Sequence, residues 1–256
     1  NILNNKLISS EKKVCISSDG WFYFKIYIEK EKSNSILVEN IFPFLMEHIS
    51  KKEVSQFFYL RYSDPDFQIR LRIKAIENQT FFKCIDMLNN LLSNYAIKSY
   101  SVELYEREIE RYGGKCLFNI IEQEFYFDSL LVLEYLEKKE KKEVEMHQEY
   151  IFGMQCVYDV LRAFINNTIE EEKFLNKVIS HKEFHDIYRK NKGDFYDLFI
   201  ESIKEENKQS PYFQSRNKIL QLYADKIKII DKQGKLTNSK TDIILSVIHM
   251  FCNRYN

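Results

Sequence analysis

The spacing of the apolar residues changes near residue 116, and this change constrains the fold more than any other feature of the chain. Before it, short segments with the alternation or the aromatic and β-branched content of strands are interleaved with segments of helical spacing. The strand-like segments are 21–28, 54–62, 67–75 and 97–105, and the helix-like segments are 36–50 and 81–95. Their order, βαββαβ, is that of the ferredoxin-like unit.

After residue 116 the apolar spacing is helical throughout. It predicts helices at 117–139, 143–166, 169–190, 194–206, 211–231 and 239–255. We therefore expect an α+β protein in which a ferredoxin-like βαββαβ unit is followed by a helical half packed on it. The expected division is an N-terminal extension at 1–20, the sheet unit at 21–116, and the helical part of the same domain at 117–256.

The charges of the chain balance, with 38 Lys and Arg against 38 Asp and Glu, so any anion site has to be local. No apolar run approaches the roughly 20 residues that span a bilayer, and residues 1–10 lack the layout of a signal peptide, which predicts a cytoplasmic protein. The five cysteines are widely spaced without a CxxC motif, which indicates reduced side chains. Because the chain begins with Asn, we expect a processed protein or part of a longer one.

Two arginines follow each other along one face of the predicted strand 67–75. The two-residue period sends Gln68, Arg70 and Arg72 to one face and the apolar residues between them to the other. The arginines are then about 6.6 Å apart, and an anion between them would relieve their repulsion. Strand 21–28 adds Tyr23 and Lys25 to the same polar face. The competing interpretation is that the arginines face solvent or pair with acidic residues of the helical half.

The segment 105–114 (YEREIERYGG) follows the fourth predicted strand and ends in two glycines, which permit unusual backbone conformations. Its alternating Glu and Arg residues are typical of a surface ladder of ion pairs. Its position at the end of a strand beside the arginine face instead favours a functional role for Arg111.

The last predicted helix carries a polar seam beside its apolar stripe. Asp242, Ser246, His249 and Asn253 recur at helical spacing. His249 is the best candidate for proton transfer, because histidine changes its charge near neutral pH. The alternative is that His249 has a structural role only.

His181 and His185 lie four positions apart, but the sequence offers no third ligand beside them, so we predict no metal site. Walker, GxGxxG and GxSxG motifs are absent from the sequence.

Four segments together resemble a known family. They are the strand beginning at Trp21; FYLRY at 58–62 with DP at 64–65 and RLR at 70–72; EIERYGG at 108–114 with FDS at 127–129; and IHM at 248–250 with NR at 253–254. They are similar to the C-terminal glutamate-elimination domain of class I lantibiotic dehydratases, which also occurs as stand-alone thiopeptide-type bacteriocin biosynthesis proteins. The resemblance covers about residues 20–256.

The resemblance implies a carbon–oxygen lyase. In this family a partner domain uses glutamyl-tRNA to esterify Ser or Thr of a precursor peptide, and the elimination domain expels glutamate to leave dehydroalanine or dehydrobutyrine. The catalytic residues that match are Arg70, Arg72, Arg111 and His249, and the expected substrate-binding residues are Arg61, Tyr23, Lys25 and Gln68. One departure is Gln68, where members commonly carry His, which concerns the subtype more than the reaction.

The resemblance also implies partners. They are a precursor peptide with glutamylated Ser or Thr, a fused or separate tRNA-dependent glutamylation protein, a cyclase, and a second copy of the chain in a homodimer. No metal, organic cofactor or direct nucleic-acid contact is expected, and the cytoplasmic protein could join a membrane-associated biosynthetic complex.

Two other functions stay open. Pyridine synthases of thiopeptide biosynthesis belong to the same fold family and join two dehydroalanines in a [4+2] cycloaddition. A non-catalytic peptide- or RNA-binding module is the second alternative, although strand 67–75 offers Gln68, Arg70 and Arg72 in place of the aromatic residues on which RNA bases stack.

Overall fold

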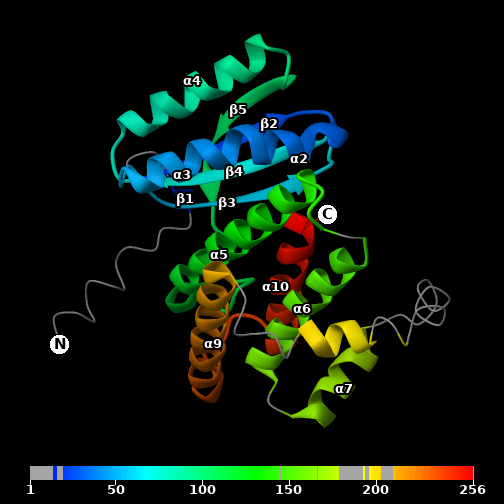
Figure 1. The fold of residues 1–256 in the computed structure, drawn as a ribbon. Coiled ribbons are helices and arrows are strands. Elements are labelled where there is room, and N and C mark those ends of the chain that lie inside the picture. Colours follow the sequence, from blue (N-terminus) through cyan, green and yellow to red (C-terminus); the bar gives the residue numbers. More distant parts are fainter. Residues whose placement is uncertain are drawn as a thin grey trace.

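The computed structural model describes residues 14–15, 20–144, 146–165, 167–178, 193, 196–202 and 210–255. A four-stranded sheet lies at its centre, with one group of helices on each side (Figure 1). The strands are β2 (Trp21–Tyr27), β3 (Val54–Tyr62), β4 (Gln68–Ala75) and β5 (Ser99–Glu103), in the spatial order β3-β4-β2-β5. All neighbours are antiparallel. The predicted βαββαβ unit and the α+β class are therefore confirmed.

The helices between the strands cover the apolar face of the sheet. The first is a continuous helical segment between β2 and β3, which consists of a 3-10 turn (Lys30–Lys32), α2 (Ser33–Ile36), a π-helical turn (Leu37–Ile41) and α3 (Phe42–Ser50). The second is α4 (Gln79–Ser93), which follows β4. Ile69, Leu71 and Ile73 of β4 are fully buried against them, together with Leu45 and Leu88. Each such side chain contributes about 1.5–3 kcal/mol through burial, which sets the face that β4 turns to these helices.

The predicted end of the fourth strand, at residue 105, is wrong. β5 stops at Glu103, and Leu104 is 62% exposed. The next two residues form β6 (Tyr105–Glu106), which pairs with β1 (Val14–Cys15) in a separate two-stranded sheet. The Tyr105 ring is buried and packs edge-on against Trp21 and Phe58.

The second half is helical, as predicted. It contains α5 (Lys115–Glu140), α6 (Met146–Phe164), α7 (Thr168–Val178), α9 (Pro211–Lys232) and α10 (Lys240–Tyr255). Ser210 caps α9 by accepting from the Phe213 N–H, and Pro211 occupies the first turn, where no intrahelical N–H bond is lost. The rest of the predicted helix 169–190 and both ends of the predicted helix 194–206 lie outside the described residues. None of the described helices is long and apolar enough to cross a bilayer.

The free edge of β3 is covered by side chains from α5 and α10. The Tyr59 N–H donates to Ser129 Oγ of α5 (3.4 Å), and the Arg61 N–H donates to Asn253 Oδ1 of α10 (2.9 Å). The Tyr59 hydroxyl donates to the Arg254 carbonyl (3.2 Å). Because an uncovered edge strand exposes unpaired N–H groups, these contacts both satisfy β3 and attach α10 to the arginine-bearing sheet.

A buried charge network joins the helices behind this edge. Asp128 of α5 accepts from Arg216 of α9 (2.5 Å) and from Arg254 of α10 (3.5 Å), and all three side chains are fully buried. Burial lowers the pKa of Arg216, but the combined effect of the Asp128 carboxylate and the neighbouring groups outweighs burial and raises that pKa overall. Glu124 lies in the same interior, and burial raises its pKa far above its usual range, so it stays protonated. The network ties three helices together through one carboxylate.

Candidate active site

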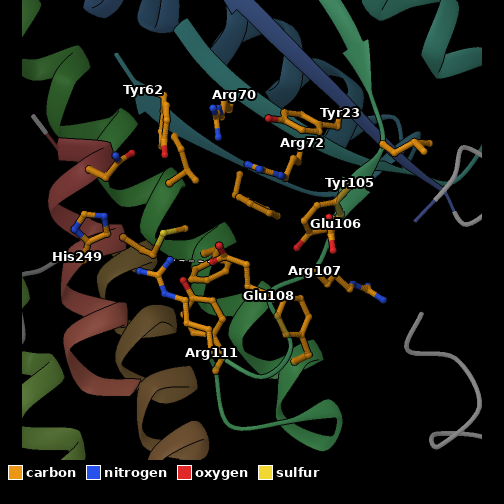
Figure 2. A pocket seen from close by; sticks show the side chains of 18 of the residues that line it. Tyr23, Tyr62, Arg70, Arg72, Tyr105, Glu106, Arg107, Glu108, Arg111 and His249 are labelled. Carbon is orange, nitrogen blue, oxygen red and sulfur yellow. Dashed lines mark hydrogen bonds and ion pairs between the residues drawn. The ribbon is translucent and has the colours of Figure 1, made fainter. Parts of the chain in front are cut away.

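A cavity of about 660 Å³ opens between the polar face of the sheet and the helical half (Figure 2). The residues that line it come from β2, β3, β4, the 104–112 segment, α5 and α10. They are Tyr23, Phe58, Leu60, Tyr62, Arg70, Arg72, Leu104, Tyr105, Glu106, Arg107, Glu108, Glu110, Arg111, Tyr112, Phe118, Phe125, His249, Met250 and Asn253. The expected catalytic residues Arg70, Arg72, Arg111 and His249 all lie around this one cavity.

Aromatic rings hold the guanidinium groups of Arg70 and Arg72. Arg70 Cζ lies 3.5 Å from the ring centre of Tyr62, and Arg72 Cζ lies 4.3 Å from that of Tyr23. Arg72 also lies 5.2 Å from the ring centres of both Phe58 and Tyr105. Rings attract a cation but offer no hydrogen-bond acceptor in their plane. The two arginines are therefore oriented without being neutralised.

Several nitrogens of these arginines are buried without a hydrogen-bond partner among the described residues. They are Nε of Arg70 and Nε and Nη1 of Arg72. Burial lowers the pKa of Arg72, although a guanidinium remains charged in proteins. An unpaired buried charge costs several kcal/mol, and a carboxylate that enters the cavity would remove that cost through charge-assisted hydrogen bonds.

Arg111 enters the cavity from the side opposite the sheet (Figure 2). Its Nε donates to Ser246 Oγ of α10 (3.0 Å), and its Nη1 donates to Glu108 (2.9 Å). The turn that presents it ends at Gly113, whose φ of +90° favours glycine and where a Cβ would lie 2.8 Å from the Leu117 side chain. The predicted ladder of ion pairs thus exists in part at Glu108–Arg111, but it orients Arg111 at the cavity.

His249 projects from α10 at the rim of the cavity (Figure 2). It is exposed, and within the part of the chain that the structure describes no hydrogen bond holds its ring. Its neighbours on the predicted polar seam anchor α10 on either side, since Ser246 accepts from Arg111 and Asn253 accepts from the backbone of β3. A free imidazole on an anchored helix is suited to proton transfer.

The four expected substrate-binding residues lie in different places in the structure, and only Tyr23 lines the arginine cavity. Tyr23 lines the cavity, whereas Lys25 pairs with Glu103 (3.3 Å) outside it. Gln68 is 1% exposed, and its amide donates to the carbonyls of residues 64 (3.1 Å) and 66 (3.3 Å), which closes the hairpin turn. Arg61 points to the helix-covered side, where its Nη1 donates to Ser33 Oγ (3.3 Å), and it lines a second, neighbouring cavity.

Sequence reasoning missed Tyr62, Tyr105 and Asn253 as cavity residues. A signal for Tyr62 existed, because the two-residue period of 54–62 places it on the same face as Phe58, but the pairing partner of that face was unknown. Asn253 was recognised only as part of a polar seam. Its contact with β3 spans 192 positions, which periodicity does not reveal.

Among the described residues no group of three or more His, Cys, Asp or Glu side chains could hold a metal ion. His181 and the histidine four positions later lie outside the described residues. The cavity brings together arginines, a residue type suited to binding an anion, and one imidazole at its rim, a group suited to proton transfer.

Known proteins match this chain over most of its length. It is 25% identical over 244 residues to the epidermin biosynthesis protein EpiB of Staphylococcus epidermidis, covering 91% of this chain and 24% of that protein. The subtilin biosynthesis protein SpaB of Bacillus subtilis is 25% identical over 261 residues (99% and 25%). The nisin biosynthesis protein NisB of Lactococcus lactis is 24% identical over 258 residues (98% and 25%). The chain thus spans about a quarter of the length of these curated relatives.

Solved structures share the fold. The tRNA-dependent lantibiotic dehydratase MibB from Microbispora sp. superposes with a TM-score of 0.79 at 14% identity, over 94% of this chain and 26% of MibB. TsrL gives 0.62 at 11% identity, over 92% and 89%. The pyridine synthase TbtD from thiomuracin biosynthesis gives 0.58 at 9% identity, over 92% and 91%. Such low identities indicate a common fold alone.

A family model described as "Lantibiotic biosynthesis dehydratase C-term" matches residues 21–256, nearly the whole chain. This match includes the sheet, the turn that carries Arg111 and helix α10 with His249, which surround the cavity. The chain therefore belongs to the family of lantibiotic biosynthesis dehydratase C-terminal domains.

Proposed function

We propose that this chain eliminates glutamate from O-glutamylated Ser or Thr residues of a ribosomally made precursor peptide, leaving dehydroalanine or dehydrobutyrine. The observation that carries the proposal is the cavity in which Arg70, Arg72, Arg111 and His249 meet, with guanidinium nitrogens that lack an acceptor among the described residues. A glutamyl ester brings the carboxylate that these arginines need. Membership of the dehydratase family supports a role in peptide dehydration.

The reaction needs a base, an anion site and a leaving group. In our proposal His249 accepts the proton from Cα of the modified residue. The electron pair left on Cα forms the double bond to Cβ, the bond from Cβ to the ester oxygen breaks, and glutamate departs as a carboxylate. Arg70 and Arg72 hold the glutamyl group, and Arg111 stabilises the negative charge that develops on the departing carboxylate.

In our proposal other machinery attaches the glutamyl group, and the chain spans about a quarter of the length of each curated relative. The MibB relative is described as tRNA-dependent. We therefore propose a tRNA-dependent glutamylation protein, fused or separate, as a partner, with the precursor peptide as the shared substrate. A cyclase and a second copy of this chain remain predicted partners.

The direct test uses a peptide that already carries an O-glutamyl serine. We expect the chain to release glutamate from this peptide without tRNA or ATP. Mass spectrometry measures the loss of the glutamyl group from the peptide. Arg72→Ala should slow the single-turnover rate about 10²–10³-fold, as loss of a charge-stabilising donor does, and His249→Ala about 10²–10⁴-fold. Arg162→Ala on the exposed side of α6 is the matched control and should leave the rate unchanged. Unchanged rates in the cavity variants would contradict the assignment.

One observation favours a second candidate, the pyridine synthase. The pyridine synthase TbtD shares the fold of this chain over 91% of the length of TbtD. Incubation with a dehydrated linear peptide that lacks any glutamyl ester separates the two functions. A synthase would cyclise that peptide, whereas an eliminase would leave it unchanged.

A further inference from the structure

We infer that a second cavity, which adjoins the arginine cavity, holds the stretch of substrate peptide next to the modified Ser or Thr. This inference rests on the proposed elimination reaction and adds the path of the peptide to it. The second cavity has a volume of about 630 Å³. It is lined by Lys30, Arg61, Tyr62, Ser63, Asp64, Phe67, His249, Cys252 and Asn253.

The two cavities share a boundary made of Tyr62, His249 and Asn253. Two of these residues are held in place. The Tyr62 ring lies against the Arg70 guanidinium (3.5 Å to the ring centre), and Asn253 Oδ1 accepts from the Arg61 N–H of β3 (2.9 Å). The boundary is therefore a fixed wall with an exposed imidazole in it, and both cavities reach that imidazole.

The chemistry of the two cavities differs. Four arginines line the first: Arg107 is paired with Glu122, and Arg70, Arg72 and Arg111 suit the small anionic glutamyl group. The second combines the cations Lys30 and Arg61 with the hydroxyl of Ser63, the carboxylate of Asp64 and the ring of Phe67. Lys30, Ser63 and Asp64 are exposed at its mouth. Such a mixed lining recognises backbone amides and varied side chains, which is what a peptide segment of changing sequence presents.

The position of His249 at the boundary fits the connectivity of the substrate. The glutamyl group is attached to Cβ, whereas the proton to be removed is on Cα, which belongs to the peptide backbone. A base that reaches both cavities meets Cα if the acyl group enters the arginine cavity and the backbone continues into the second one. The inferred path therefore places the scissile Cβ–O bond at the wall.

The test compares a minimal substrate with a peptide. The minimal substrate is N-acetyl-O-glutamylserine methylamide, and the longer one carries the same residue with four residues on each side. We expect the unmodified chain to show a KM about tenfold lower for the longer substrate. Ser63→Trp, which fills the second cavity from an exposed turn position, should abolish this difference. Lys30→Glu should reduce it.

The matched control is Asn90→Trp, which adds the same bulk to an exposed position on α4, on the other side of the sheet (Figure 1). It should retain the preference for the longer substrate. Equal KM values for both substrates in the unmodified chain, or a preference that survives Ser63→Trp, would overturn the inference while leaving the elimination proposal intact. Failure of the unmodified chain to release glutamate from either substrate would overturn the proposed function and the inference with it. If the unmodified chain prefers the longer substrate, peptides extended on one side alone will show which flank occupies the second cavity.

Discussion

The arginines of the core and the arginines of the cavity lie in opposite surroundings. In the core, Arg216 and Arg254 share the carboxylate of Asp128, and no part of either side chain is exposed. In the cavity, Arg70 and Arg72 contact aromatic rings, and no carboxylate of the described residues lies within ion-pair distance of them. In both regions some guanidinium nitrogens lack a hydrogen-bond partner among the described residues. The distinguishing feature is the missing carboxylate, which in our proposal the substrate supplies.

Arg216→Met should show the largest effect on stability. It leaves Asp128 buried with Arg254 as its remaining partner at 3.5 Å, and breaking a buried pair in this way costs about 3–5 kcal/mol. The matched variant, Arg72→Met, removes no ion pair and relieves a charge that lacks an acceptor among the described residues, so it should not lower the free energy of unfolding. Urea denaturation measures both. Equal losses would mean that Arg72 has a structural partner and would erase the distinction between the two regions.

Glutarate should stabilise the chain through the cavity. This dicarboxylate resembles the glutamyl group, and a ligand at about 100 times its Kd raises the free energy of unfolding by about 2.7 kcal/mol. Thermal unfolding with and without glutarate measures the shift, with sodium chloride at the same ionic strength as the control. Arg72→Met should lose most of the shift. A shift of the same size in that variant would show that glutarate binds elsewhere.

Glu124→Gln tests the charge balance of the core. Burial raises the pKa of Glu124, so above about pH 4.5 the unfolded chain releases a proton that the folded chain keeps. The stability that this group contributes is therefore lost as the pH rises toward the folded pKa, by at most about 1.4 kcal/mol per pH unit. Gln imitates the protonated form, so the advantage of the variant should grow as the pH rises above about 4.5 in denaturation experiments. A constant difference would mean that Glu124 is ionised in the core.

Ser246→Ala should show the smallest effect. It removes the acceptor that holds Arg111 Nε, and one hydrogen bond is worth about 0.5–1.5 kcal/mol, so elimination should slow about threefold to tenfold. The loss should appear in kcat more than in KM if Arg111 acts on the departing carboxylate. Ser246→Thr keeps the hydroxyl and should restore the rate. An unchanged rate in Ser246→Ala would show that Glu108 alone orients Arg111.

Local periodicity was sufficient for the strand faces. The two-residue period of 67–75 correctly placed Ile69, Leu71 and Ile73 against helices and Arg70 and Arg72 on the opposite face. It failed at the end of the fourth strand, where the backbone of Tyr105 pairs with β1 instead of continuing along β2. Alternation continues through that break, because it reports the direction of side chains and not the partner of the backbone.

Gln68 and Lys25 illustrate the limit of a face argument. Both lie on the polar face with the arginines, as expected, but Gln68 closes the hairpin turn and Lys25 pairs with Glu103. Their roles depend on the ends of the strand and on the neighbouring strand, which periodicity does not specify. Their assignment to substrate binding remains a prediction.

The sequence alone determined the order of the elements, the arginine-bearing face of β4 and the polar seam that carries His249, because these follow from the spacing of neighbouring residues. The tertiary structure decided which of these features meet. The bond between Arg111 and Ser246 joins positions 135 residues apart, and the bond between Asn253 and β3 joins positions 192 apart. Such contacts depend on how helices pack against a sheet edge, since hydrophobic burial favours packing without specifying partners that are distant in sequence.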